Sequence, residues 1–252
     1  MIKQTNIFVV LVLMFSVTLF AQDMDPEAAQ AYNNGNELMK TGDFDGAIKS
    51  YEAALKSSKD YRIYYQKAVA LKRANKVAES VDILKTCIKQ NPDFDLAYNA
   101  LAGSYFTLRD HDAAIEMFLK GIEVTKNATL KKRMQENIAR SYTSKATEQL
   151  NQGNSSAAIE NLIKATQNHN FDAAYLTLAR AYTDNSEWDK AIEAADNAAK
   201  YRSSISRGAP AYYKGIAHRG KGEIAKAIEM FNEAKADAQY RKLAEYEISV
   251  TK

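Results

Sequence analysis

The chain has 252 residues, of which 46% are hydrophobic and 26% are charged, enough apolar side chains for one large domain or two small ones. Its 34 Lys and Arg residues nearly balance its 31 Asp and Glu residues, and a formal net charge of +3 provides no strong field for nucleic acid. The single cysteine, Cys87, excludes an intramolecular disulfide and a zinc site made of several cysteines.

The first 21 residues have the pattern of a signal peptide. Lys3 gives the positive start, residues 7–20 form an apolar run broken only by Ser16 and Thr18, and Ala21 precedes the expected cleavage point. The 14 residues of this run are fewer than the roughly 20 that a spanning helix needs, which favours cleavage over an uncleaved anchor. No membrane span is therefore expected to remain.

The end of this leader indicates a compartment. It lacks the cysteine to which a lipid would be attached, and residues 22–27 follow as a short N-terminal lead. We expect an exported protein, periplasmic or secreted. The ending Leu19-Phe20-Ala21-Gln22 resembles that of exported Bacteroidota proteins.

After the leader, one pattern recurs six times. A small residue followed by Ile or Val appears at steps of 33, 34, 44, 33 and 36 residues, at Ala47, Ser80, Ala114, Ala158, Ala191 and Ala227. When this residue is numbered 20 within each repeat, positions 8 and 27 also hold only small residues. Position 8 is Gly35, Ala68, Ala102, Ala146, Ala179 and Gly215, and position 27 is Ala54, Cys87, Gly121, Ala165, Ala198 and Ala234.

The spacing within each repeat predicts two packed helices. Positions 4, 8 and 11 lie on one face of a first helix, and positions 20, 24, 27 and 28 lie on one face of a second. Small residues at 8, 20 and 27 let the two backbones approach closely. Breakers such as Thr41-Gly42-Asp43 and Lys221-Gly222-Glu223 stand between the helices, whereas repeat 2 has Asn75 in place of the glycine.

The period and the small-residue pattern resemble the tetratricopeptide repeat family over residues 28–241. The resemblance implies an all-α fold, an α-solenoid of about six helix–turn–helix units in a right-handed superhelix. It also implies a concave groove that binds peptides or proteins.

Two irregularities predict how the repeats are divided. About ten extra residues precede repeat 4, and a first helix of about 23 residues, starting near residues 127–129, accommodates them. We expect repeats 1–3 over residues 28–126 and repeats 4–6 over residues 127–241. A capping helix over residues 236–250 overlaps the last repeat and packs through Tyr240, Leu243, Ala244 and Ile248.

No pattern of catalytic or metal-ligating residues is present. The chain lacks phosphate-binding loops, the His-Glu-x-x-His motif and the Gly-x-Ser-x-Gly motif. Cys87 occupies position 27, where the other repeats have Ala or Gly, and His111, His169 and His218 lack ligand spacing. We therefore expect no enzyme, no metal and no cofactor.

The remaining candidates are residues that the family resemblance places on or beside the concave face. They combine basic, aromatic and amide side chains, and Arg can hold a carboxylate through two hydrogen bonds. The set is Tyr32, Asn36, Arg62, Tyr65, Lys72, Arg73, Asn99, Phe106, Arg140, Arg180, Tyr212 and Arg219. The alternative is that these are ordinary solvated helix residues.

The family's two-carboxylate clamp for chaperone C-termini is not matched. Its basic and amide positions correspond to Tyr32, Asn36, Gln66, Leu96 and Ala100, of which only Asn36 fits.

Three functions remain open. The first is a non-enzymatic scaffold in the bacterial envelope, a monomer that holds an acidic protein or peptide in its groove; self-association is the alternative to the monomer. The second is an accessory or regulatory subunit of an envelope enzyme acting on peptidoglycan or polysaccharide, or of a secretion complex, binding through its convex face or the 126–138 insertion. The third, an enzyme in its own right, lacks any supporting residues.

Overall fold

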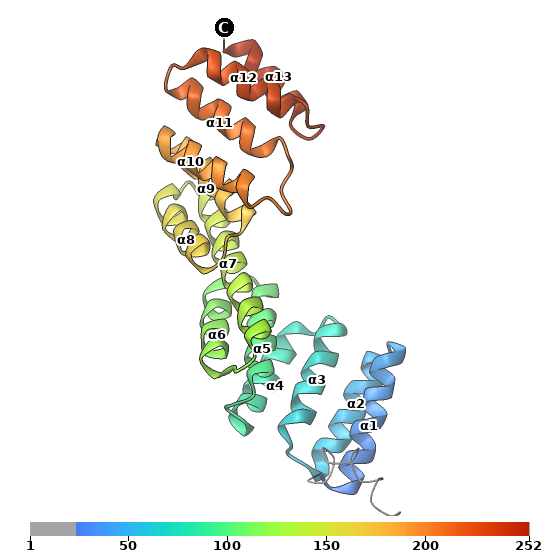
Figure 1. Cartoon of the computed structure of the whole chain (residues 1–252). Helices are drawn as coiled ribbons and strands as arrows, with labels where there is room; N and C mark the ends of the chain where they lie inside the picture. Colours follow the sequence, from blue (N-terminus) through green and yellow to red (C-terminus); the bar gives the residue numbers. More distant parts are fainter. Residues whose placement is uncertain (1–23, 252) are drawn as a thin grey trace, which may run out of the picture. The chain divides into compact units, whose positions relative to one another are not determined.

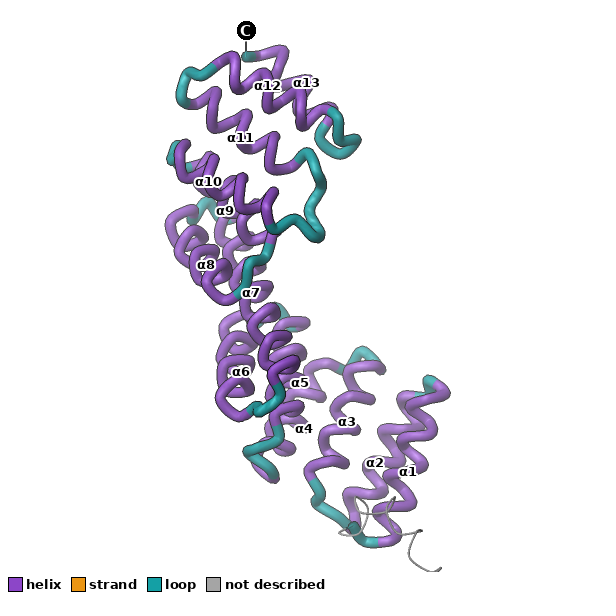
Figure 2. Tube along the Cα trace, viewed as in Figure 1, coloured by secondary structure: helices purple, strands orange, loops and turns teal. Residues whose placement is uncertain are grey.

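The computed structural model describes residues 24–251, and over that range the chain consists of thirteen α-helices without a strand (Figures 1 and 2). The helices are α1 (Pro26–Thr41), α2 (Phe44–Ser57), α3 (Tyr61–Arg73), α4 (Val77–Gln90), α5 (Asp95–Thr107), α6 (His111–Val124), α7 (Ala128–Asn151), α8 (Ser155–Asn168), α9 (Asp172–Asp184), α10 (Trp188–Lys200), α11 (Ala209–Gly220), α12 (Ile224–Lys235) and α13 (Arg241–Val250). The predicted all-α class is confirmed. The expected signal peptide, residues 1–21, lies outside the described range.

The helices form six consecutive hairpins, distributed over two compact units. Of the described residues, those up to Asn91 form one unit and those from Pro92 form the other. In the first unit α1 packs on α2 and α3 packs on α4; in the second, the hairpins are α5–α6, α7–α8, α9–α10 and α11–α12. This is the helical-hairpin architecture that the resemblance implies. The helices present between residues 24 and 251 are too short or too polar to cross a membrane.

The division between the two units differs from the expected one at residue 126. Helix α7, which begins at Ala128, packs on both α6 and α8, so residue 126 lies within the second unit. The boundary falls instead at Asn91–Pro92.

Small residues bring the paired helices together as predicted. Ala47, Ala54, Ala114 and Ala158 are fully buried. A Cβ atom added to Gly35 would lie 2.6 Å from the ring of Tyr51, and one added to Gly215 would lie 2.5 Å from the ring of Phe231. Position 8 therefore supplies the space that the large side chain at position 24 fills.

The turn inside each hairpin places one residue in the left-handed region. At position 15, Gly42, Gly153 and Gly222 have φ values of 83°, 79° and 78°, and Asn75, Arg109 and Ser186 have 63°, 64° and 58°. The turn geometry thus persists in the three repeats that lack the glycine. Side chains other than Asn pay a conformational cost there.

Helix α7 spans 24 residues, compared with the predicted length of about 23. Its start is capped by Asn127, whose side chain accepts hydrogen bonds from the amides of Thr129 and Leu130 at 3.0 and 3.1 Å. In its first half, Leu130, Met134 and Ile138 are buried against the core of the preceding hairpin. Its second half packs on α8.

Helix α13 covers the last hairpin, but it begins at Arg241, five residues later than predicted. Asp237 explains the delay, because its carboxylate binds the Ser206 hydroxyl and the amides of Gly208 and Gln239. The packed face also differs from the prediction. Leu243 is 49% exposed, whereas Glu247 is only 9% exposed.

Candidate functional site

In the first unit, two of the predicted groove residues serve the packing of Tyr51. The Tyr51 hydroxyl donates to Asn36 Oδ1 at 2.8 Å, and the Tyr32 and Tyr51 rings lie 5.9 Å apart. Burial, followed by the proximity of Tyr32, raises the pKa of Tyr51. Tyr65, on α3, is partly buried.

The three basic candidates of α3 differ in their pairing. Arg62 Nε donates to Asp60 Oδ1 at 2.9 Å, and the Arg62 amide donates to the same oxygen at 2.8 Å. Although burial alone raises the pKa of Asp60, these contacts with Arg62 hold it below its usual value. Lys72 and Arg73 are exposed residues, and no acidic side chain among residues 24–251 forms an ion pair with either. Although Lys72 is exposed as a whole, desolvation of its amino group lowers its pKa.

In α5, the two candidates lie against the protein core. Asn99 Oδ1 is buried, and the described part of the chain offers it no hydrogen-bond partner. The Phe106 ring meets the imidazole of His111 edge-on at 5.6 Å. His111 Nε2 in turn lies 2.9 Å from Glu148 Oε1 on α7, and Arg109 Nη2 donates to the same oxygen at 2.6 Å. Phe106 and His111 therefore help to join the third and fourth hairpins.

Arg140, on α7, is exposed, and the centre of its guanidinium lies 5.0 Å from the centre of the Phe171 ring. It lines a cavity of about 210 Å³ together with Glu136, His169, Asn170, Phe171, Ser203 and Ser204. All seven residues belong to the second unit. The sequence indicated Arg140 but gave no sign of the other six.

Asp172 fixes one wall of this cavity. Its Oδ2 accepts the amides of Ser203, Ser204 and Ile205 at 2.6, 2.6 and 3.0 Å, and its Oδ1 accepts the Ser204 hydroxyl at 2.9 Å. The side chain is fully buried. Burial alone raises the pKa of Asp172, but these hydrogen bonds outweigh it and hold the pKa well below its usual range.

Both predicted groove residues of α11 are bound by the carboxylate of Glu247. Tyr212 donates its hydroxyl to Glu247 Oε1 at 3.2 Å, and Arg219 Nη1 pairs with Oε2. Burial, then the charge of Glu247, raises the pKa of Tyr212 to about 12. In α9, Arg180 lies 3.8 Å from Asp184. The structure therefore provides internal partners for Arg62, Arg180, Tyr212 and Arg219.

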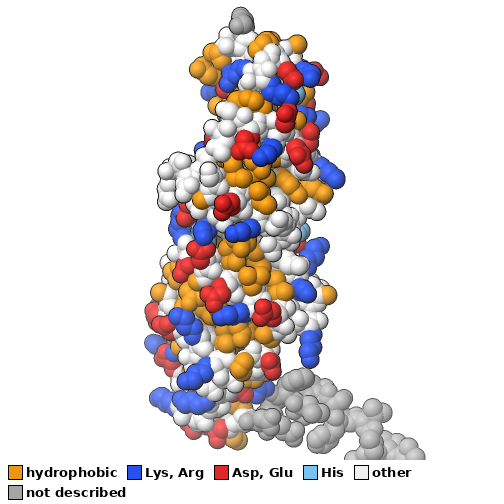
Figure 3. Space-filling view, turned by 90° about the vertical axis from the view of Figure 1, so that its left-hand side faces the viewer, with side chains coloured by type: hydrophobic (Ala, Val, Ile, Leu, Met, Phe, Trp, Pro, Cys, Tyr) orange, Lys and Arg blue, Asp and Glu red, His pale blue; other side chains and the backbone are white. Residues whose placement is uncertain are grey.

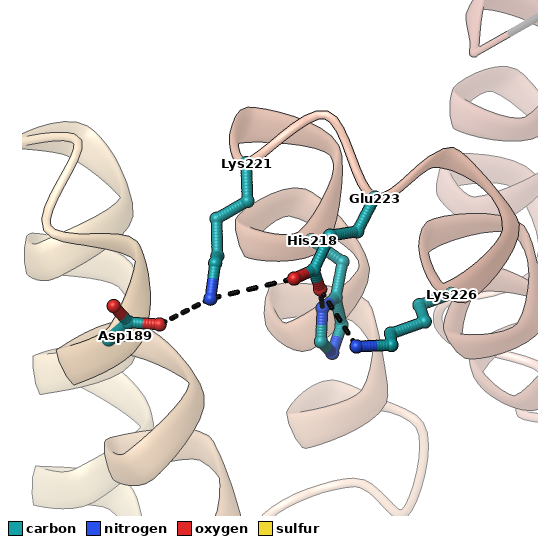
Figure 4. A network of polar contacts seen from close by, with 5 residues as sticks. All are labelled: Asp189, His218, Lys221, Glu223 and Lys226. Atoms are coloured by element: carbon teal, nitrogen blue, oxygen red, sulfur yellow. Dashed lines mark hydrogen bonds and ion pairs between the residues drawn. The ribbon is translucent and has the colours of Figure 1, made fainter.

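Cys87 is buried in the core, and His218 contacts the carboxylate of Glu223. Cys87 is fully buried, and burial raises the pKa of its thiol to about 12, which suppresses the thiolate. Figure 4 shows Glu223 between His218, Lys221 and Lys226, with Lys221 also reaching Asp189. Hydrogen bonds from His218 and Lys226 lower the pKa of Glu223. Between residues 24 and 251, no three His, Cys, Asp or Glu residues gather as a metal site would require.

The surface combines both signs of charge. Figure 3 shows Lys and Arg side chains interspersed with Asp and Glu over one face, together with apolar areas. Many of these charges form ion pairs between hairpins, such as Lys76 with Asp45 at 2.7 Å and Lys145 with Asp112 at 2.5 Å. Among the basic candidates, Lys72, Arg73 and Arg140 take part in no such pair within the described residues.

The fold is that of a helical-hairpin repeat protein, and sequence comparison gives the family. A model of the tetratricopeptide repeat matches residues 32–86, 65–124, 143–203 and 176–241, more than half of the chain. The chain belongs to the tetratricopeptide repeat family.

Two curated relatives match part of the chain. The small glutamine-rich tetratricopeptide repeat-containing protein 2 of Mycosarcoma maydis is 30% identical over 108 residues, which are 42% of this chain and 31% of the relative. The Hsp70-Hsp90 organizing protein of Triticum aestivum is 28% identical over 105 residues, which are 41% of this chain and 18% of the relative. The matches thus span less than a third of either relative.

Two solved structures share the fold. YrrB, described as a tetratricopeptide repeat protein with an unusual peptide-binding site, has a TM-score of 0.53 at 15% identity, covering 79% of this chain and 97% of YrrB. MamA has a TM-score of 0.51 at 22% identity, covering 66% of this chain and 93% of MamA. At these identities the likeness establishes the helical-hairpin fold.

Proposed function

We propose that this protein is a non-enzymatic scaffold that binds acidic segments of a partner protein on the first helices of the hairpins within each of its two units. Membership of the repeat family supports protein binding in general, and YrrB is a structural neighbour described as having a peptide-binding site. The observation that carries the proposal is the pairing pattern of the basic candidates. Lys72, Arg73 and Arg140 have no ion-pair partner in the part of the chain that is described, unlike Arg62, Arg180 and Arg219.

An export setting is part of the proposal. The leader over residues 1–21 supports a place in the periplasm or outside the cell, and the bacterial envelope setting rests on that leader alone. We also propose that the chain acts as a monomer, because α13 covers the apolar side of the last hairpin.

The test begins with crosslinking in the native setting and identification of the captured protein. The affinity of its bound segment is then measured for the wild type and for K72E/R73E/R140E. Loss of three basic contacts should weaken binding by roughly tenfold or more, with a marked dependence on salt.

A matched control is K49E/K89E/K164E. It makes the same change in charge on exposed lysines of the second helices α2, α4 and α8, and it should bind like the wild type. Equal affinity of both triple variants for the segment would contradict the proposal.

One observation supports the second candidate function, that of an accessory subunit. In the 126–138 insertion, Lys131, Lys132 and Arg133 are exposed and lack an ion-pair partner within residues 24–251. Deletion of the insertion would not be a clean test, because Leu130, Met134 and Ile138 cover the core of the α5–α6 hairpin. The variant K131E/K132E/R133E tests this surface without opening that core, and loss of partner binding by this variant alone would favour the accessory role.

A further inference from the structure

The cavity beside Arg140 collects residues that are far apart in the sequence. Its lining comes from α7 (Glu136 and Arg140), from the α8–α9 connection (residues 169–171) and from the α10–α11 connection (Ser203 and Ser204). One helix and the two connections that join three successive hairpins thus contribute to one small hollow.

Two side chains in the cavity lining, those of Arg140 and Asn170, can donate hydrogen bonds to an anion. Arg140 has its guanidinium 5.0 Å over the Phe171 ring, which holds the planar group by a cation–π contact. The described residues supply no carboxylate that pairs with it. Asn170 uses its Oδ1 to accept from the Tyr175 hydroxyl at 3.0 Å, so its amide nitrogen remains as a second donor.

One carboxylate beside the cavity is compensated by hydrogen bonds from the backbone. Asp172 follows Phe171 directly, but its carboxylate takes three backbone amides and one hydroxyl of residues 203–205. These bonds fix the wall formed by Ser203 and Ser204. The preformed wall reduces the ordering cost that a ligand would meet.

The cavity lining also contains a hydrogen-bond acceptor, the carboxylate of Glu136. Glu136 Oε1 lies 4.0 Å from His169 Nε2, and the Glu136 side chain is 36% exposed. Glu136 and Arg140 are four residues apart on α7, so they share one face of the helix. A ligand that bears a carboxylate next to an N–H group would therefore find a donor and an acceptor in the same hollow.

The size of the hollow limits its occupant. About 210 Å³ is below the roughly 300–1,000 Å³ of pockets that hold drug-sized ligands. At about 30 Å³ per water molecule, it has room for one amino-acid side chain and its amide. We propose that this cavity binds a single carboxylate-bearing residue of a partner peptide, with the carboxylate on Arg140 and the adjoining peptide N–H on Glu136. The inference rests on the proposed function and adds an anchor residue to it.

The test uses three short peptides and the full chain. The peptides are acetyl-Ala-Ala-Glu-Ala-Ala-amide, acetyl-Ala-Ala-Ala-Ala-Ala with a free terminal carboxylate, and acetyl-Ala-Ala-Gln-Ala-Ala-amide as the neutral reference. Nuclear magnetic resonance follows the Arg140 Nε–H signal and the amides of Ser203 and Ser204. A carboxylate peptide should shift these signals and bind at least fivefold more tightly than the Gln peptide. The first two peptides show whether an acidic side chain or a chain terminus is preferred.

Variants separate the cavity from the rest of the groove. R140Q should abolish the difference between carboxylate and neutral peptides, R140K should retain part of it, and R241Q, at an exposed arginine of α13, should retain all of it. Absence of signal shifts at millimolar peptide, or equal binding by R140Q, overturns the inference. A captured partner that binds R140Q normally but is weakened by K72E/R73E would leave the scaffold function standing and remove only this anchor.

Discussion

Glu247 in α13 lies between Tyr212 and Arg219 of α11, accepting the tyrosine hydroxyl on one oxygen and pairing with the arginine on the other. A residue of the capping helix thus fills the place where a partner's carboxylate was expected. The Glu247 side chain is 12% exposed, so its contacts are largely shielded from water.

We therefore expect E247Q to destabilise the protein. The change leaves Arg219, whose side chain is 32% exposed, without its charge partner, which costs about 1–3 kcal/mol. The melting temperature should fall, and the pKa of Tyr212, now about 12, should decrease because the neighbouring negative charge is lost. Thermal unfolding and a tyrosine absorbance titration measure the two effects.

The control is E245Q in the same helix. Glu245 pairs with Lys235 at 3.2 Å, but both side chains are nearly half exposed, so its loss should change stability by less than about 1 kcal/mol. If E247Q and E245Q have the same melting temperature, Glu247 does not hold the cap in place.

A second prediction concerns the close approach of paired helices. G35A should destabilise the first unit, because the new Cβ would lie 2.6 Å from the buried ring of Tyr51. Overpacking of this kind costs about 1–3 kcal/mol, more than the roughly 1 kcal/mol that Ala gains over Gly in a helix. Denaturant unfolding measures the change. N33A, at an exposed position of the same helix, should be neutral or stabilising; a stabilised G35A would disprove the steric role of position 8.

For one turn residue, a substitution by glycine should increase the stability of the protein, in contrast to G35A. Ser186 has φ of 58° and is exposed, and left-handed backbone costs a non-Gly residue about 1 kcal/mol. S186G should raise the unfolding free energy by part of that amount. G42A should lower it, since Gly42 has φ of 83° with open space around its Cα. Calorimetry on both variants compares the two signs, and a destabilised S186G would contradict the argument.

Asp172 should make the free energy of unfolding depend on pH in the acidic range. The pKa of its carboxyl is lowered in the folded protein, so it contributes stability at pH values above the unfolded value of about 3.9. That contribution is lost as the pH falls through the folded value. D172N should therefore be less stable than the wild type at pH 7 by about 2–4 kcal/mol, since buried amides lose a charged acceptor.

The difference between D172N and the wild type should shrink as the pH is lowered below about 4. Urea unfolding at pH 7, 5 and 3 follows this change. D184N provides the control, because Asp184 is exposed and 3.8 Å from Arg180. A pH-independent difference for D172N would mean that the side chain acts by shape rather than by charge.

The repeat register could be predicted because it depends on side-chain size at fixed spacing. Ala47, Ser80 and Cys87, chosen by period alone, are all fully buried. The turn of repeat 2 is harder to predict, since Asn75 adopts the same left-handed backbone as the glycines. Asn tolerates that region better than most residues, which is the signal that the sequence offered.

The site could be predicted only in part, because pairing between distant residues decides which charges remain available. Periodicity places Arg140 and Arg219 alike on first helices, yet one lies beside a cavity and the other is paired with Glu247. One signal was present: Glu247 lies three residues after Ala244 and seven after Tyr240, which is helical spacing toward the packed side. Asp172 offered no comparable signal, because its partners are backbone amides of an irregular connection.

The 24-residue helix α7 has a practical consequence for dissecting the protein. Its first half closes one hairpin and its second half opens the next, so a fragment that stops at residue 126 would strip the cover from Ile115 and Phe118. Repeats 3 and 4 should consequently melt as a single cooperative block. Truncation experiments on this chain are better cut between Asn91 and Pro92 than at the place where the repeat count is halved.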